Sequence, residues 1–164
     1  MKAVCIRRAR LSDAEEICRL INHYAERGKM LHRSLESVYD SLREFQVAEA
    51  DSGELLGCVA VDIFWADLAE IKSLAVDAGC LREGLGSQLV QAAIEDARGL
   101  GIRRVFALTY EKEFFSRHGF RVIDRDTLPE KVWRECIACP KADACDEIAM
   151  ILHLSENGPG RQDK

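Results

Sequence analysis

A glycine-containing stretch at residues 84–87 has the composition of an anion-binding site. It reads Gly84-Leu85-Gly86-Ser87 and stands between an apolar, strand-like segment and a helix-like segment. The first backbone N–H groups of a helix have no partner within the helix, and they lie at the positive end of its dipole. Because glycine has no Cβ, an anion can approach this backbone closely. The stretch therefore predicts a site for a phosphate group.

Two better-known phosphate motifs are excluded at this stretch. No Gly-Lys-Ser/Thr follows, so it is not the phosphate loop of nucleotide triphosphatases. Leu89 stands where the dinucleotide fingerprint has its third glycine. A lone Gly-x-Gly is also explained by a close helix–strand contact or by a helix cap, and this alternative stays open at the level of the motif.

A second group with chemical potential is the cysteine cluster Cys136-x-x-Cys139 followed by Cys145. Two thiolates at this spacing point to one centre, and a third ligand nearby would suit zinc or an iron–sulfur cluster. His153, Cys5 or a partner chain could provide the fourth ligand. Reduced thiols in a packed loop and a redox-sensitive pair are the alternatives. The cluster is distant in sequence from the predicted phosphate site, so we assign it no catalytic role.

Hydrophobic periodicity predicts the elements that must position these groups. Strands are expected at residues 2–8, 45–50, 55–64, 70–76, 104–108, 120–123 and 148–154. Helices are expected at residues 12–28, 34–42, 85–99, 113–118 and 128–136. Ser12 and Glu15 fit a capping box at the start of the first helix. Because several strands follow one another before the main helix, the pattern predicts a mixed α/β domain rather than a doubly wound sheet.

Length and composition limit the classes of protein that remain. The 164 residues suit one domain, which we place at residues 1–154 with a flexible tail at 155–164. A net charge of −5 argues against a broad nucleic-acid-binding surface. Neither a signal peptide nor a membrane-spanning run is apparent, so we expect a cytoplasmic protein whose seven cysteines are reduced.

The block from Ser73 to Gly86, together with the segment Phe115–Phe120, resembles the GNAT acetyltransferase superfamily. The resemblance implies a single-domain α/β (α+β) fold with a mixed, mostly antiparallel central sheet flanked by helices. It also implies acetyl-CoA as cosubstrate, with its pyrophosphate at the glycine-containing stretch. The cofactor-binding residues that it implies are Leu74, Ala75, Val76, Arg82, Glu83, Gly84, Leu85, Gly86 and Ser87.

A narrower resemblance is to the acetyltransferase domain of bacterial N-acetylglutamate synthases. It rests on residues 28–34, 70–76, 108–110 and 128–130, which occur in the same order. It implies glutamate as the acceptor, a role in arginine biosynthesis, and a short form without the kinase-like domain of longer relatives. Leu81 stands where the superfamily commonly has Arg or Gln, and Arg82 is its neighbour. Phe115 stands where many members have a tyrosine that acts as an acid, and these synthases resemble the chain in lacking that tyrosine.

Acetyl transfer to an amine needs a base, a polarised thioester carbonyl and an acid for the departing thiolate. Glu70 is our candidate base, directly or through water, and Tyr110 our candidate acid. A backbone N–H within residues 74–76 could stabilise the oxyanion. Arg33 and Lys72 are the candidates for binding the carboxylates of the substrate, since a planar guanidinium binds a carboxylate through two bonds. By period-two spacing, Glu70, Lys72 and Leu74 should share one face of a strand.

Each of these side chains also has a structural explanation. The three charged residues could be surface charges, and a tyrosine at the end of a strand is commonly part of a core. Two other functions also stay open: acetylation of another small amine or of a protein N-terminus, and non-catalytic sensing of acetyl-CoA or redox state. A small-molecule substrate is expected, without nucleic acid or membrane, and a homodimer is left open.

Overall fold

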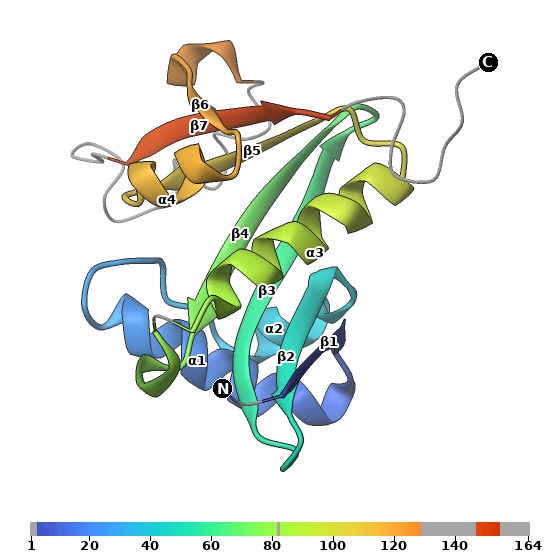
Figure 1. Ribbon diagram of the computed structural model, residues 1–164, viewed down its shortest axis with the longest axis vertical. Helices are drawn as coiled ribbons and strands as arrows, with labels where there is room; N and C mark the ends of the chain where they lie inside the picture. The colour runs from blue at the N-terminus through green and yellow to red at the C-terminus, as the bar shows by residue number, and fades with distance from the viewer. Residues whose placement is uncertain (1–2, 82, 129–146, 155–164) are drawn as a thin grey trace. The chain divides into compact units, whose positions relative to one another are not determined.

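The computed structural model describes residues 3–81, 83–128 and 147–154. Its strands are β1 (Val4–Arg8), β2 (Phe45–Ala50), β3 (Leu55–Trp65), β4 (Leu68–Val76), β5 (Arg104–Thr109), β6 (Arg121–Val122) and β7 (Ile148–His153) (Figure 1). Its α-helices are α1 (Ala14–Ala25), α2 (Leu35–Asp40), α3 (Leu85–Gly99) and α4 (Lys112–Arg117).

The strands form one mixed sheet in the order β1-β2-β3-β4-β5-β7-β6. Strands β1 and β2, β2 and β3, β5 and β7, and β6 and β7 pair antiparallel. Strands β4 and β5 pair parallel, from Leu68–Arg104 to Glu70–Phe106. A parallel pair needs a long crossover, and α3 is part of it. The predicted fold class, a mixed and mostly antiparallel sheet with flanking helices, is confirmed.

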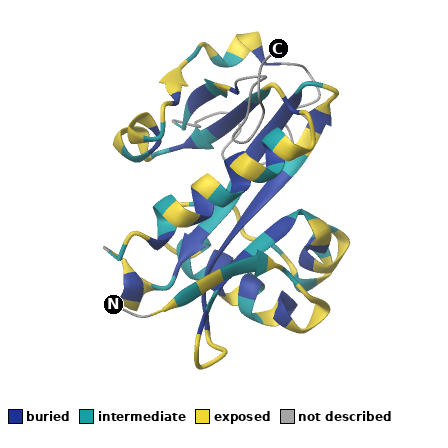
Figure 2. Ribbon diagram, turned by 45° about the vertical axis from the view of Figure 1, so that its right-hand side comes forward, coloured by how far each residue is buried: buried dark blue, intermediate teal, exposed yellow. Residues whose placement is uncertain are grey.

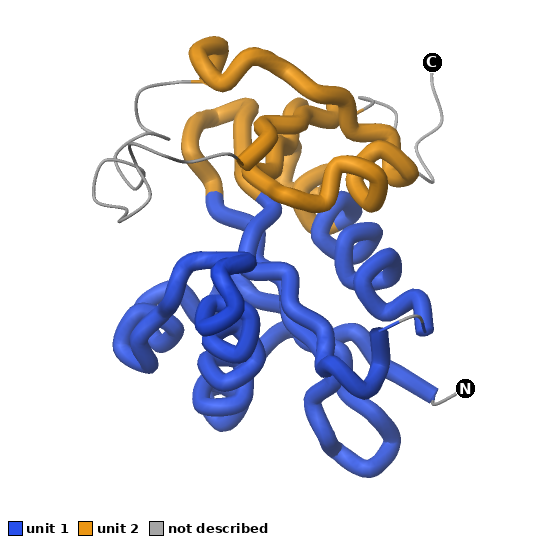
Figure 3. Tube along the Cα trace, turned by 90° about the vertical axis from the view of Figure 1, so that its left-hand side faces the viewer, with its two compact units in different colours: residues 1–62, 71–95 blue, residues 63–70, 96–164 orange. Residues whose placement is uncertain are grey.

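The chain divides into two compact units (Figure 3). Unit 1 comprises residues 1–62 and 71–95, and unit 2 comprises residues 63–70 and 96–164. In unit 1, β3 is buried along most of its length (Figure 2). Successive side chains of a strand point to opposite faces. Cys58 accordingly packs in a cluster with the apolar stripe of α1, whereas Gly57 faces Leu89 of α3.

Unit 2 has its own apolar cluster and a separate pair of packed phenylalanine rings. The cluster contains Phe64, Leu68, Phe106, Leu128, Ala149 and Ile151. The rings of Phe115 and Phe120 lie edge to face, with their centroids 5.1 Å apart. Gly119 joins them with a φ of 91°, a conformation in which glycine is the residue without steric cost. The Gly-Phe turn expected from the sequence is therefore part of the packing of this unit.

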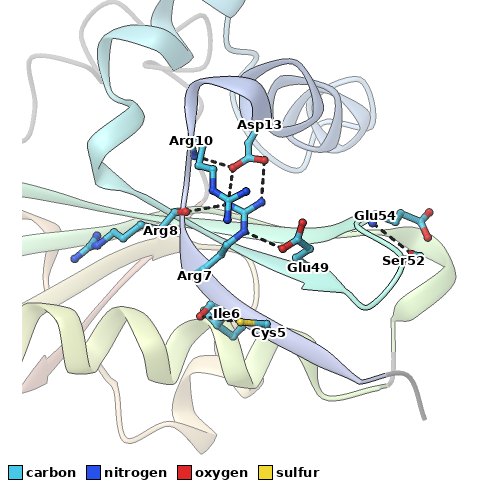
Figure 4. Close-up of polar contacts among 9 residues, drawn as sticks. All are labelled: Cys5, Ile6, Arg7, Arg8, Arg10, Asp13, Glu49, Ser52 and Glu54. Atoms are coloured by element: carbon cyan, nitrogen blue, oxygen red, sulfur yellow. Dashed lines mark hydrogen bonds and ion pairs between the residues drawn. The ribbon is translucent and has the colours of Figure 1, made fainter.

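The start of α1 differs from the prediction. The expected capping box between Ser12 and Glu15 is wrong, because a 3₁₀ turn (Leu11–Asp13) precedes the helix. The Asp13 carboxylate instead accepts a 2.7 Å hydrogen bond from the Arg10 backbone N–H. It also binds Arg7, which bonds Glu49 of β2 as well (Figure 4). The Asp13 carboxylate thus fixes this end through a local bond to Arg10 and an ion pair with Arg7, in place of the predicted Ser12 and Glu15.

The other described elements agree with the predicted ranges to within one or two residues at most ends. The first helix ends at Ala25, three residues before the expected Gly28. The expected helix at 128–136 and the expected tail at 155–164 lie outside the described residues. Among the residues that the structure describes, no helix is long and apolar enough to cross a bilayer.

Gly57 of β3 faces Leu89 of α3 in unit 1. A Cβ built on it would lie 2.8 Å from Leu89 Cδ1 and 3.1 Å from the Ala75 carbonyl oxygen. Leu89 is fully buried, so it has little room to move away. The absence of a side chain at position 57 therefore sets how closely α3 can pack on the sheet.

We expect Gly57→Ala to lower the free energy of unfolding by about 1–3 kcal/mol, because it overpacks a dense contact. Urea denaturation followed by circular dichroism measures the change. Gly99→Ala is the matched control: its Cβ would meet nothing within 4 Å. The control should leave stability equal or slightly higher, since alanine favours helix. Equal stability of the two variants would contradict the proposed packing limit.

Candidate functional site

The loop after β4 is fixed by hydrogen bonds within its own turn. Asp77 caps a 3₁₀ turn (Ala78–Cys80): its Oδ1 accepts from the Gly79 N–H at 3.1 Å. Its carbonyl accepts from the Cys80 N–H at 2.8 Å. The Cys80 side chain is buried, which anchors the middle of the loop. The loop therefore has a defined path toward α3.

A backbone hydrogen bond from the second turn marks the start of α3. That bond runs from the Gln88 N–H to the Gly84 carbonyl at 3.1 Å. Gly84 has a φ of 78°, and a Cβ added to it would meet nothing within 4 Å. Leu85 is buried and holds the turn in place, whereas Gly86 and Ser87 are half-buried. This geometry fits an anion at the backbone of residues 85–87.

The remaining residues predicted to bind the cofactor lie on both sides of this turn. Ala75 and Val76 are buried at the end of β4, and Leu74 and Glu83 are half-buried. Arg82 lies outside the described residues.

Tyr24 of α1 holds the end of β4, a contact that the sequence analysis did not identify. Its hydroxyl donates a 2.5 Å hydrogen bond to the Val76 carbonyl. Burial of the phenol, with Asp77 nearby, raises the pKa of Tyr24, so the proton needed for this bond is retained. The apolar stripe of α1 predicted a buried position at Tyr24, but no local signal links it to a residue 52 positions away.

Strand β4 contains one irregular residue. Ser73 has a φ of 55°, in the left-handed region that residues other than glycine rarely adopt. Its neighbour Lys72 contacts Asp62, its own hydroxyl contacts Arg33, and Ala75 packs in the cluster that contains Cys58. Two successive side chains thus face the same side, as in a β-bulge. Lys72, Ser73 and Ala75 thus share this face. This differs from the regular alternation expected from the sequence, in which Leu74 would follow Lys72 there.

The Arg33 guanidinium is held by hydroxyl groups. It contacts Ser37 Oγ at 3.1 and 3.2 Å, Ser41 Oγ at 2.6 Å and Ser73 Oγ at 3.3 Å. It also lies over the ring of Phe45, 5.3 Å from the centroid. These contacts orient a partly buried positive charge without neutralising it.

The two predicted substrate-binding cations differ in their partners. Within the described ranges, no carboxylate forms an ion pair with Arg33. Lys72, in contrast, forms a 2.8 Å ion pair with Asp62 of β3, and both side chains are about one-fifth exposed (19% and 21%). Of the two cations, Arg33 is therefore better suited to bind the carboxylate of a ligand.

The two predicted catalytic residues belong to unit 2. Glu70 is buried, with 7% of its surface exposed, and its backbone pairs with Phe106 of β5. Tyr110 directly follows β5 and is half-buried. Thr109 shapes this strand end, because its hydroxyl accepts from the Glu111 N–H at 2.8 Å. Both predicted catalytic roles stay predictions.

The cysteine cluster Cys136, Cys139 and Cys145 lies outside the described residues. Within the described part of the chain, no three His, Cys, Asp or Glu side chains gather as a metal site would require. The two residues considered as a fourth ligand are described: Cys5 is exposed on β1, and His153 lies 3.5 Å from an Arg121 nitrogen.

Comparison with known proteins places this geometry in context. Residues 11–120 match the model of the acetyltransferase (GNAT) family. An uncharacterized N-acetyltransferase of Chlorobaculum tepidum is 43% identical over 150 residues, covering 92% of this chain and 96% of its own. An amino-acid acetyltransferase of Mycobacterium tuberculosis is 41% identical over 153 residues, covering 92% of this chain and 84% of its own.

A solved structure resembles the chain closely. N-acetylglutamate synthase of Neisseria gonorrhoeae, complexed with coenzyme A and N-acetyl-glutamate, superimposes with a TM-score of 0.85 at 34% identity. The match covers 94% of this chain but 36% of that protein. The present chain thus spans about a third of the length of that synthase.

Proposed function

The chain belongs to the GNAT acetyltransferase family, and from this premise we propose that it transfers the acetyl group of acetyl-CoA to the α-amine of glutamate. The observation that carries the proposal is the Arg33 guanidinium, held by three serine hydroxyls without a carboxylate partner among the described residues. The names of the amino-acid acetyltransferase and of the N-acetylglutamate synthase support the same acceptor class.

The turn before α3 supports acetyl-CoA as the donor. A pyrophosphate needs several convergent N–H donors and a backbone that it can approach. Gly84 leaves open space where a Cβ would stand, and it directly precedes Leu85, the first residue of α3. The family model covers this turn. These residues would therefore hold the cosubstrate by its phosphates.

The Arg33 site supports an acceptor that carries a carboxylate. Its planar guanidinium can give two parallel hydrogen bonds to one carboxylate. A second carboxylate, as in glutamate, would compete with Asp62 for the Lys72 ammonium. Because Lys72 is already paired, an amino acid with one carboxylate, such as glutamine, is the second candidate acceptor.

The chemical step is an attack of the neutral amine on the thioester carbonyl carbon. A C–N bond forms, the C–S bond breaks, and coenzyme A leaves as a thiolate. We assign removal of the ammonium proton to Glu70, whose burial limits competition from water, and protonation of the thiolate to Tyr110. The second proton, which leaves the nitrogen once the C–N bond has formed, returns to Tyr110 through water. A backbone N–H of residues 74–76 would stabilise the oxyanion. A role of this protein in arginine biosynthesis follows only if glutamate is the acceptor.

The first test is thiol release from acetyl-CoA in the presence of each of the twenty amino acids. We expect glutamate to give the highest kcat/KM. A higher value for glutamine would replace glutamate by the second candidate. Binding of acetyl-CoA without turnover on any amino acid would favour the sensor reading over both.

Gly84→Ala should raise the KM for acetyl-CoA about tenfold, because the new Cβ obstructs the approach of the phosphates. Gly53→Ala is the matched control, since Gly53 also has a positive φ, of 91°, with nothing within 4 Å of an added Cβ. Both variants should lose similar stability, about 1–2 kcal/mol, from the left-handed backbone. An unchanged KM in Gly84→Ala would count against phosphate binding at this turn.

Arg33→Gln should raise the KM for the amino acid at least about tenfold, since charge-assisted hydrogen bonds contribute about 1.5–3 kcal/mol. The KM for acetyl-CoA should change by less than about twofold. Steady-state kinetics with each substrate varied in turn gives both values. Arg19→Gln, which removes an exposed arginine paired with Glu16, is the control. Equal effects of Arg33→Gln on both KM values would refute the carboxylate site.

A further inference from the structure

The main chain at Arg33 is held by side chains of α1. Residues 31–34 lie outside any helix or strand. The Asn22 Oδ1 accepts a 2.9 Å hydrogen bond from the Arg33 N–H, and Asn22 Nδ2 donates a 2.8 Å bond to the Arg33 carbonyl. One carboxamide thus satisfies both backbone groups of one residue.

A second contact comes from one helical turn earlier. The Cys18 thiol donates to the Arg33 carbonyl at 3.3 Å, and Cys18 Sγ lies 3.3 Å from Asn22 Nδ2. Residues four apart on a helix share a face, so both side chains meet the same loop. The adjoining face of α1 is fully packed, with Ile17 and Ile21 at 0% and 1% exposure. The loop is therefore attached to a rigid element.

We propose that Asn22 is a positioning residue for the acceptor site: by holding the Arg33 main chain against α1, it fixes where the guanidinium is presented. This inference rests on the proposed function of Arg33. The side-chain contacts of Arg33 come from Ser37, Ser41 and Ser73, so the residue is held at its backbone by α1 and at its guanidinium by other segments.

Asparagine suits the two hydrogen bonds that position 22 makes with the Arg33 main chain. A donor and an acceptor on one planar group are needed to meet an adjacent N–H and C=O. An aspartate keeps the bond from the Arg33 N–H but has no N–H for the carbonyl. A glutamine places the same amide one methylene farther from the helix. Two-bond recognition of a carboxylate depends on orientation, so a small shift of the Arg33 backbone weakens it.

Asn22→Ala should raise the KM for the amino acid about tenfold, with kcat and the KM for acetyl-CoA changed by less than about twofold. Asn22→Asp should have an intermediate effect, and it provides the same comparison if the alanine variant does not fold. Arg19→Ala, on the exposed side of α1, is the control and should change none of these values. Parallel changes in both KM values would overturn the positioning role.

A double-mutant cycle of Asn22 and Arg33 distinguishes a positioning role of Asn22 from a general effect on structure. In an Arg33→Gln background, Asn22→Ala should raise the KM for the amino acid by less than about twofold further, because the group it positions is absent. Independent, multiplicative effects would overturn the proposal.

Hydrogen exchange separates this inference from the proposed function. Asn22→Ala should lose amide protection over residues 31–34, whether or not the protein acetylates glutamate. Unchanged protection would overturn the positioning role even in an active enzyme. An inactive wild type with the expected loss of protection would instead refute the proposed acceptor while leaving the anchor in place.

Discussion

The left-handed backbone of Ser73 within β4 is the constraint on which the candidate site depends. A left-handed residue other than glycine costs on the order of 1–2 kcal/mol, so its neighbours must stabilise it. The Cys58 thiol donates to its carbonyl at 3.4 Å, and Arg33 donates to its hydroxyl at 3.3 Å. Because two successive side chains then face the same side, the strand presents Ser73 to Arg33 next to the Lys72–Asp62 ion pair. A regular strand would have pointed one of these two side chains toward the other face.

Most of the fold could be predicted from the sequence because its signals are local. The stripe Ile17, Leu20 and Ile21 in α1, and the period of Leu85, Leu89 and Ala93 in α3, depend only on 3.6-residue spacing. The role of Asp13 at the first turn was missed. Its bond to the Arg10 N–H lies within four residues, but Arg10 is not a usual capping residue, and the ion pairs from Asp13 to Arg7 and from Arg7 to Glu49, 42 residues away, lie beyond the range of capping rules.

The candidate site was predictable to a similar degree and for the same reason. The glycine turn before α3 is contiguous in sequence, and Arg33 was proposed from a short motif. The contacts that orient them were not visible: Asn22 reaches Arg33 across 11 residues, and Tyr24 reaches Val76 across 52. The positive φ of Ser73 could not be predicted from the residue type, since serine does not favour this conformation. Such features arise from tertiary packing, which overrides local preference.

The Cys58 thiol, which bonds the Ser73 carbonyl, affects how the protein responds to oxidants. Burial raises the pKa of Cys58 to about 12. Since the thiolate is the nucleophile, the raised pKa and the burial of the side chain both slow the reaction of Cys58 with peroxide and alkylating agents. The proton that the thiol donates to Ser73 thus persists under conditions that consume exposed cysteines. The irregular part of β4 is therefore supported by a thiol that is protected from oxidation.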